Sequence, residues 1–200
     1  MIAFIYYDAG NIKSVEKAIQ HLGEEAIITR DKDIILNSDK VILPGVGAFG
    51  DAMEKINAYD LKNTIYDVVD AGKPFLGICL GLQLLFKTSE ESPGATGLGI
   101  LDGEIVRIPA KEGLKIPHMG WNDLTITPGA TLYQGIEDHS YVYFVHSYYL
   151  KAHEDIVAAT TEYSTLIHAS VEKNNVFACQ FHPEKSGTVG LKILDNFLKL

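Results

Sequence analysis

The chain begins with apolar runs that alternate with segments in which apolar residues recur every three or four positions. The apolar runs predict strands at residues 2–7, 26–29, 40–43 and 74–78. The periodic segments predict helices at residues 12–22, 61–72 and 80–86. Continuously apolar strands are typical of parallel sheets with helices on both faces, so we expect an α/β fold with a central, mostly parallel sheet. In such sheets, ligand sites form beyond the carboxyl ends of the strands.

The second half of the chain has a different pattern. Short strands separated by turn residues are predicted at residues 104–108, 123–127, 141–145, 156–160, 166–171 and 176–181. These strands indicate an antiparallel region added to the parallel sheet, and a last helix is predicted at residues 187–200. No linker, repeat or low-complexity segment interrupts the sequence, so we expect one domain over residues 1–200.

Composition argues against several classes of protein. Lys and Arg number 17 against 26 Asp and Glu, and the net charge of −9 comes without a basic cluster for nucleic acid. Cys79 and Cys179 are too few for a disulfide framework and form no zinc-ligand spacing. No segment approaches the ~20 apolar residues of a membrane helix, and no signal peptide is visible. We expect a cytoplasmic protein with no metal and no cofactor.

Cys79 occupies the sharpest local motif, Gly77-Ile78-Cys79-Leu80-Gly81, between a predicted buried strand and a predicted helix. This arrangement matches a nucleophile elbow, in which flanking glycines permit a tight turn that exposes the central side chain. The following helix directs free N–H groups and the positive end of its dipole at the sulfur, which favours the nucleophilic thiolate. A buried structural cysteine is the alternative interpretation.

His182 is the histidine whose surroundings best suit a partner for that thiol. It follows the predicted strand at 176–181, and Pro183 restricts it to an extended backbone. Residues two apart in an extended segment point to the same side, so Glu184 can orient the His182 ring and stabilise its imidazolium. An ordinary polar turn after a strand is the alternative for these residues taken alone.

A tetrahedral intermediate at Cys79 would need hydrogen-bond donors for its oxyanion. The backbone N–H of Leu80 follows the cysteine directly, and the loop Pro44-Gly45-Val46-Gly47 offers a second donor from Val46 or Gly47. The same loop matches the dinucleotide fingerprint G-x-G-x-x-G over residues 45–50. Because the next predicted strand lacks the acidic residue that the fingerprint requires at its end, nucleotide binding is the weaker interpretation.

Taken together, three motifs resemble the signatures of class I glutamine amidotransferases. They are Pro44-Gly45-Val46-Gly47, Gly77-Ile78-Cys79-Leu80-Gly81-Leu82-Gln83 and His182-Pro183-Glu184, and their order along the whole chain is the family's. Two further segments, at residues 117–122 and 143–148, resemble the glutaminase subunits of imidazole glycerol phosphate synthases in histidine biosynthesis. The resemblance implies the class I glutamine amidotransferase fold.

The resemblance also implies chemistry and residue roles. Cys79 would attack the side-chain amide of glutamine, His182 would carry the proton, and Glu184 would orient His182. The implied glutamine contacts are Gly45, Gly47, Gln83, His146, Ser147 and Tyr148. Ammonia would pass to a (β/α)₈ cyclase subunit in a heterodimer that makes imidazole glycerol phosphate and an aminoimidazole carboxamide ribotide. The expected interface residues are Asn11, His118, Met119, Trp121, Asn122 and Lys185.

Two alternatives remain at this point. The chain could be a glutaminase that serves pyridoxal phosphate synthase, against which the segment at residues 118–122 argues, or one that serves a sugar-modifying synthase. It could equally be a paralogue that feeds a different cyclase-like partner. It could also be a regulatory module in which Cys79 is inert. Reaction of Cys79 with a glutamine-mimicking alkylator distinguishes an enzyme from such a module.

Overall fold

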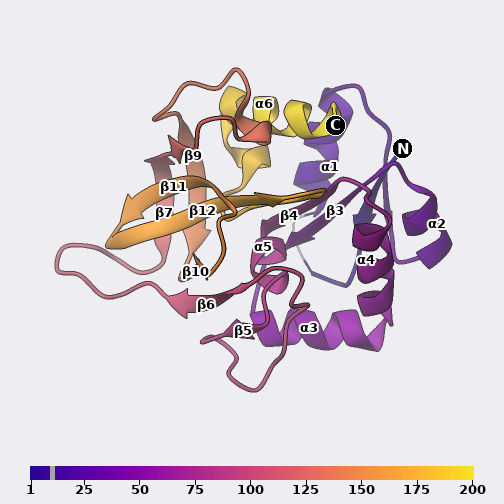
Figure 1. The fold of residues 1–200 in the computed structure, drawn as a ribbon, viewed down its shortest axis with the longest axis horizontal. Coiled ribbons are helices and arrows are strands. Elements are labelled where there is room, and N and C mark those ends of the chain that lie inside the picture. The colour runs from indigo at the N-terminus through magenta and orange to yellow at the C-terminus, as the bar shows by residue number, and fades with distance from the viewer. Residues whose placement is uncertain (10–11) are drawn as a thin grey trace.

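A long central sheet organises the computed structural model, which describes residues 1–9 and 12–200 (Figure 1). Its parallel part contains, in spatial order, β2 (Ala26–Thr29), β1 (Ile2–Ile5), β3 (Lys40–Gly45), β4 (Phe75–Cys79) and β13 (Val176–Cys179). Neighbouring strands in this part run parallel. The carboxyl ends of β3, β4 and β13 therefore meet at one edge of the sheet, which is where the predicted motifs lie.

Helices cover both faces of the parallel strands, and this explains why β1 and β4 are buried along their whole length. One face is covered by α1 (Ile12–His21) and α6 (Gly187–Leu198). The other face is covered by α2 (Lys32–Asn37), α3 (Phe49–Ala58), α4 (Leu61–Asp70) and α5 (Leu80–Leu84). Each face thus has its own hydrophobic core.

The second half of the chain extends the sheet with antiparallel strands. Beyond β13 the order continues with β12 (Thr165–Lys173), β10 (Tyr148–Ala152) and β6 (Gly103–Arg107), and the short β5 (Thr88–Ser89) pairs parallel with β6 at the end of the sheet. β12 also pairs with β11 (Val157–Tyr163), which in turn pairs with β8 (Thr125–Ile126). A separate antiparallel pair is formed by β7 (His118–Asp123) and β9 (Tyr141–His146). Two 3₁₀ helices complete the chain, η1 (Thr131–Tyr133) and η2 (Pro183–Lys185).

The expected α/β architecture with an added antiparallel region is confirmed, whereas several elements escaped the sequence pattern. Helix α2 has only six residues, too few for a clear helical period. Helix α3 begins within the loop that matched a nucleotide fingerprint, which obscured its periodicity. Strands β7 and β10 depend on pairing with β9 and β6, which are distant in sequence.

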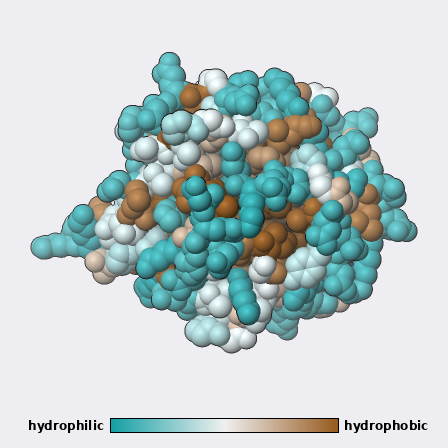
Figure 2. Space-filling view, viewed as in Figure 1, coloured by the Kyte–Doolittle hydropathy of each residue, from teal (hydrophilic) through white to brown (hydrophobic). Residues whose placement is uncertain are grey.

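The surface facing the viewer in the orientation of Figure 1 is mainly hydrophilic, with hydrophobic side chains gathered near the middle of that face (Figure 2). This distribution agrees with a charged fraction of 22%. Within the part of the chain that the structure describes, no helix is long and apolar enough to cross a membrane.

Gly81 lies where α5 packs closely against the sheet. A Cβ atom at this position would overlap the carbonyl oxygen of Leu43 on β3. We therefore expect Gly81→Ala to lower the free energy of unfolding by about 2 kcal/mol or more, because the neighbour is backbone and must shift. Denaturant unfolding measures the change.

Gly94→Ala is the matched control, because an added Cβ there meets no atom within 4 Å. We expect its free energy of unfolding to stay within about 0.5 kcal/mol of the natural chain. Equal stability of the two variants would contradict the close packing of α5 on β3.

Candidate active site

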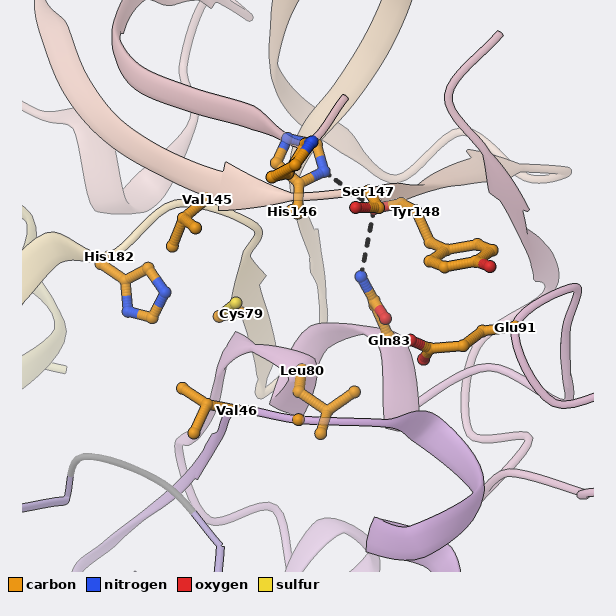
Figure 3. Close-up of a pocket in the computed structure, with 12 residues that line it drawn as sticks. Val46, Cys79, Leu80, Gln83, Glu91, Val145, His146, Ser147, Tyr148 and His182 are labelled. Atoms are coloured by element: carbon orange, nitrogen blue, oxygen red, sulfur yellow. Dashed lines mark hydrogen bonds between the residues drawn. The ribbon is translucent and has the colours of Figure 1, made fainter. Parts of the chain in front are cut away.

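Cys79 ends β4 and precedes α5 in a backbone conformation that non-glycine residues rarely adopt. Its φ is 55° and its ψ is −109°. The turn is tight enough that a Cβ at Gly77 would lie 2.7 Å from the carbonyl oxygen of Gly81. The local sequence therefore folds into a sharp strand-to-helix turn, and the Cys79 side chain points into a pocket (Figure 3).

His182 and Glu184 form a buried pair beside this cysteine. Nδ1 of His182 lies 2.8 Å from Oε1 of Glu184, and the two side chains are 3% and 2% exposed. Nε2 of His182 has no hydrogen-bond partner among the described residues, and the ring faces Cys79 (Figure 3). Burial alone would lower the pKa of His182, but its interactions with Cys79 and Glu184 raise it to about 9. The ring therefore carries a proton at neutral pH.

The segment that bears His182 is fixed by β9. The backbone N–H of His182 donates to the carbonyl oxygen of Tyr143 at 2.9 Å. The Ser186 hydroxyl donates to the carbonyl oxygen of His182 at 2.6 Å and accepts from the N–H of Tyr143 at 2.9 Å. These contacts hold the histidine at the carboxyl end of β13, next to the end of β4.

The pocket at this edge has a volume of about 410 Å³. It is lined by Val46, Gly47, Cys79, Leu80, Gln83, Glu91, Pro117, Val145, His146, Ser147, Tyr148 and His182. The fold thus brings together the predicted nucleophile, the predicted histidine and nearly all the expected glutamine contacts. In residues 1–9 and 12–200, no group of three or more His, Cys, Asp and Glu side chains is arranged to hold a metal ion.

Glu91 is a pocket residue that the sequence did not reveal. Its Oε2 accepts the backbone N–H of Phe49 at 2.9 Å, and the Ser92 hydroxyl accepts that of Gly50 at 3.0 Å. These side chains occupy the N-terminus of α3, where a dinucleotide phosphate would have to bind. A carboxylate at that position repels phosphate, which further weakens the nucleotide interpretation.

The loop at Pro44–Gly47 lies directly beside the elbow. Gly45 pairs with Cys79 in the parallel sheet, and the Tyr7 hydroxyl donates to the carbonyl oxygen of Pro44 at 2.8 Å. Val46 and Gly47 beyond them are exposed, and Gly47 has a φ of +102°. The base of the loop is therefore fixed, while its tip lines the mouth of the pocket together with Leu80, the first residue of α5.

Gln180 also lies at the site and was missed in the sequence. It is fully buried, and its Oε1 accepts a hydrogen bond from Nε2 of Gln83 at 3.0 Å. Gln83 also donates to the carbonyl oxygen of Tyr148 at 3.2 Å. The sequence did contain one feature that could have predicted this location. Gln180 lies two residues before His182, and alternate residues of an extended segment point to the same side.

His118 and His146 form a second buried pair, at the back of the pocket. Nδ1 of His146 donates to the carbonyl oxygen of Tyr148 at 2.8 Å, so its Nε2 accepts from Nδ1 of His118 at 3.0 Å. Nε2 of His118 in turn accepts from the Asn122 amide at 3.3 Å. Each neutral ring donates from Nδ1 and accepts at Nε2, so every ring nitrogen has a partner. A second proton on either ring would place its new N–H against a group that already donates to that nitrogen.

The expected interface residues on β7 divide between the two faces of that strand, and Lys185 lies on η2. Met119 and Trp121 are 63% and 56% exposed, and Lys185 is exposed beside Tyr143. His118 instead points inward and is 3% exposed, because successive residues of a strand face opposite sides. Asn122 is partly buried beneath it, and the expected Asn11 lies outside the described residues.

Comparison with known proteins identifies close relatives over the whole chain. The family model described as glutamine amidotransferase class-I matches residues 4–200. A Methanocaldococcus jannaschii protein named imidazole glycerol phosphate synthase subunit HisH is 50% identical and covers 100% of both chains. A Bacillus cereus protein of the same name is 53% identical, covering 98% of this chain and 93% of its own.

Solved structures show the same fold. A crystal structure described as glutamine amidotransferase has a TM-score of 0.78 at 22% identity and covers 100% of this chain and 98% of its own. A structure of PurLQS from Thermotoga maritima has a TM-score of 0.76 at 20% identity, with 99% and 97% covered. The arrangement of helices and strands is thus shared far beyond the similarity of sequence.

The neutral histidine pair predicts an acid-sensitive stability. Burial lowers the pKa of His118 to about 4 and that of His146 to about 3. As the pH falls below 6.5, the unfolded chain binds protons on these rings and the folded chain does not, so the free energy of unfolding decreases. Between pH 6.5 and pH 4, the free energy of unfolding should decrease in both proteins. We expect this decrease to be ~2–3 kcal/mol smaller in His118→Gln than in the natural chain.

Urea unfolding at several pH values measures this difference. His21→Gln is the control, because His21 is exposed at the end of α1. Parallel stability curves for the two variants would show that His118 is not kept neutral by the fold.

Proposed function

Because this chain belongs to the class-I glutamine amidotransferase family, we propose that it acts as the glutaminase subunit of an imidazole glycerol phosphate synthase. Relatives of that name cover 98–100% of the chain at 48–53% identity, which supports this function over a glutaminase for another synthase. One observation carries the chemistry: Cys79 on a strained elbow faces the buried His182–Glu184 pair across a pocket.

Cys79 is the proposed nucleophile. Its sulfur attacks the side-chain amide carbon of glutamine, and the thiol proton resides on His182, whose raised pKa of about 9 keeps the imidazolium charged at neutral pH. The negative oxygen of the tetrahedral intermediate is stabilised by the backbone N–H of Leu80 and by an N–H of Val46 or Gly47. His182 then gives its proton to the leaving nitrogen, and ammonia departs from a γ-glutamyl thioester.

Hydrolysis of the thioester completes the cycle. His182, now neutral, takes a proton from water as the water oxygen attacks the thioester carbon. Collapse of the second intermediate releases glutamate and restores the sulfur of Cys79 and the imidazolium of His182. Glu184 keeps the ring oriented and balances its charge in both steps, since its Oε1 lies 2.8 Å from Nδ1.

Acceptor oxygens at one end of the pocket suit the α-ammonium group of glutamine. Both hydrogens of the Gln83 amide are directed at acceptors, which leaves its Oε1 as an acceptor, and the Glu91 carboxylate lines the same pocket (Figure 3). Gly45, Gly47, Ser147 and Tyr148 complete the proposed glutamine contacts. The ring nitrogens of His146 are already hydrogen-bonded within the protein, so His146 supports Tyr148 and contacts glutamine only through its other atoms.

The partner is a cyclase subunit, which we place on the exposed face of β7 and β9 as a (β/α)₈ barrel in a heterodimer. Trp121 packs edge-on against Tyr143, and Nζ of Lys185 lies 6.0 Å from the centre of the same Tyr143 ring. Met119 pairs across the strands with Val145, which lines the pocket. A partner on this surface would cover the pocket mouth and receive ammonia without release to solvent.

Cys79→Ala separates the making of ammonia from its use. In the complex with the cyclase, we expect the variant to lose at least ~10³-fold in glutamine-dependent synthesis, because the nucleophile is absent. Synthesis from added ammonium salt should remain within about twofold of the natural complex, since the cyclase site is intact. Loss of both activities would contradict a role restricted to glutamine hydrolysis.

Trp121→Ala tests the partner surface. A large exposed aromatic at the centre of an interface contributes about 2 kcal/mol, so we expect the Kd for the cyclase to rise ~30-fold. Isothermal titration calorimetry measures the affinity. Leu166→Ala is the control, because Leu166 is an apolar residue that is 50% exposed on β12, a strand that does not pair with β7 or β9. Equal affinities of the two variants for the cyclase would contradict an interface on the exposed face of β7 and β9.

A further inference from the structure

Gln180 is a fully buried amide that touches the nucleophile and that the mechanism above does not use. Its Nε2 lies 3.8 Å from Sγ of Cys79, within the reach of a hydrogen bond to sulfur. Its Oε1 accepts from Nε2 of Gln83 at 3.0 Å. An amide buried at this depth is costly unless both of its ends are satisfied, and here one of them is satisfied by the reacting sulfur.

The hydrogen-bond network allows only one orientation of this amide. The Gln83 amide donates to two acceptors, the carbonyl oxygen of Tyr148 and Gln180 Oε1. Because Gln83 presents its hydrogens, Gln180 must present its oxygen to Gln83 and its NH₂ group to Cys79. Turning either amide would set oxygen against oxygen or N–H against N–H.

The carbonyl oxygen of Tyr148 is fixed from the opposite side as well. It accepts from Nδ1 of His146 at 2.8 Å, and His146 is held by His118. The orientation of Gln180 is therefore set by groups that form no bond to the reacting sulfur or to the carbon that it attacks. The N–H groups aimed at Cys79 are preorganised before substrate binds.

We propose that Gln180 stabilises the Cys79 thiolate by donating a side-chain hydrogen bond to Sγ, and that its Oε1 fixes the acceptor orientation of Gln83 toward the substrate. This role rests on the proposed glutaminase function, which it deepens by adding a residue to the triad. A thiolate accepts a hydrogen bond more strongly than a thiol, so the contact favours the nucleophilic form. Gln180 thus acts on the sulfur with one end and on the glutamine pocket with the other.

Three variants separate the two ends of the amide. Gln180→Met keeps the length of the side chain and removes both donor and acceptor. Gln180→Glu keeps an acceptor for Gln83 and replaces the donor with a carboxylate next to the sulfur. Gln83→Met is the comparison variant, because it leaves the Gln180 amide in place and removes only the donor that fixes its orientation.

The first measurement is the pH profile of Cys79 alkylation by iodoacetamide in the full chain, quantified by peptide mass spectrometry. Cys179 is fully buried and is quantified separately in the same digest. Losing a hydrogen bond to a charged group corresponds to about one pH unit, so we expect Gln180→Met to shift the midpoint upward by that amount. Gln180→Glu should shift it further. Gln83→Met should shift it upward by less than Gln180→Met, because the Gln180 NH₂ group is still present but its orientation is no longer fixed.

The second measurement is steady-state glutamine hydrolysis in the complex with the cyclase. Gln180→Met should lower kcat about tenfold and also raise KM, because both functions of the amide are lost. Gln180→Glu should lower kcat while KM stays within about twofold, since the acceptor for Gln83 remains. If Gln180 served only to fill space, its substitution would leave the alkylation midpoint unchanged. The two Gln180 variants would then also not differ in whether kcat or KM is affected.

Thermal unfolding shows whether each variant is folded, and Gln180→Glu carries the test if Gln180→Met does not fold. Unchanged alkylation midpoints in a folded Gln180 variant would overturn the proposal. Alkylation requires no glutaminase activity, so this result is distinct from failure of the proposed function, which would appear as absence of glutamine hydrolysis by the natural complex.

Discussion

The tight turn at Cys79 is the constraint on which the rest of the site depends. Its backbone angles of 55° and −109° hold the residue outside the usual regions for an L-amino acid. The surroundings make this conformation possible, because Gly77 and Gly81 leave room where side chains would meet backbone. Packing of α5 against β3 holds the residue in this unfavourable conformation. In this conformation, the sulfur projects into the pocket at the N-terminus of α5.

Around this turn, buried polar groups are arranged so that almost every donor meets an acceptor. Glu184 orients His182, Gln180 links Cys79 to Gln83, and His146 fixes the carbonyl oxygen that Gln83 also uses. Such networks are rigid because any single reversal leaves an unpaired group at low dielectric. The site is therefore one connected network rather than a set of independent side chains.

The sequence predicted much of this arrangement and missed particular parts for physical reasons. The elbow at Cys79 and the pair at residues 182 and 184 were accessible because their geometry is local, set by glycines and by alternation along an extended segment. Glu91 could not be recognised, because its place in the pocket depends on a hydrogen bond with Phe49 at the start of α3, which is distant in sequence. The inward direction of His118 depended on how β7 pairs with β9, which no local pattern reports.

The sequence by itself determined the fold class, the nucleophile elbow and the order of the motifs, since these depend on periodicity and on local backbone chemistry. Only the tertiary structure decided which side chains complete the site. Parallel pairing of β4 with both β3 and β13 places the loop at residues 44–47 and His182 on opposite sides of Cys79. The same pairing turns Gln180 toward the sulfur, because side-chain direction at a strand end is set by register with neighbours far away in the chain.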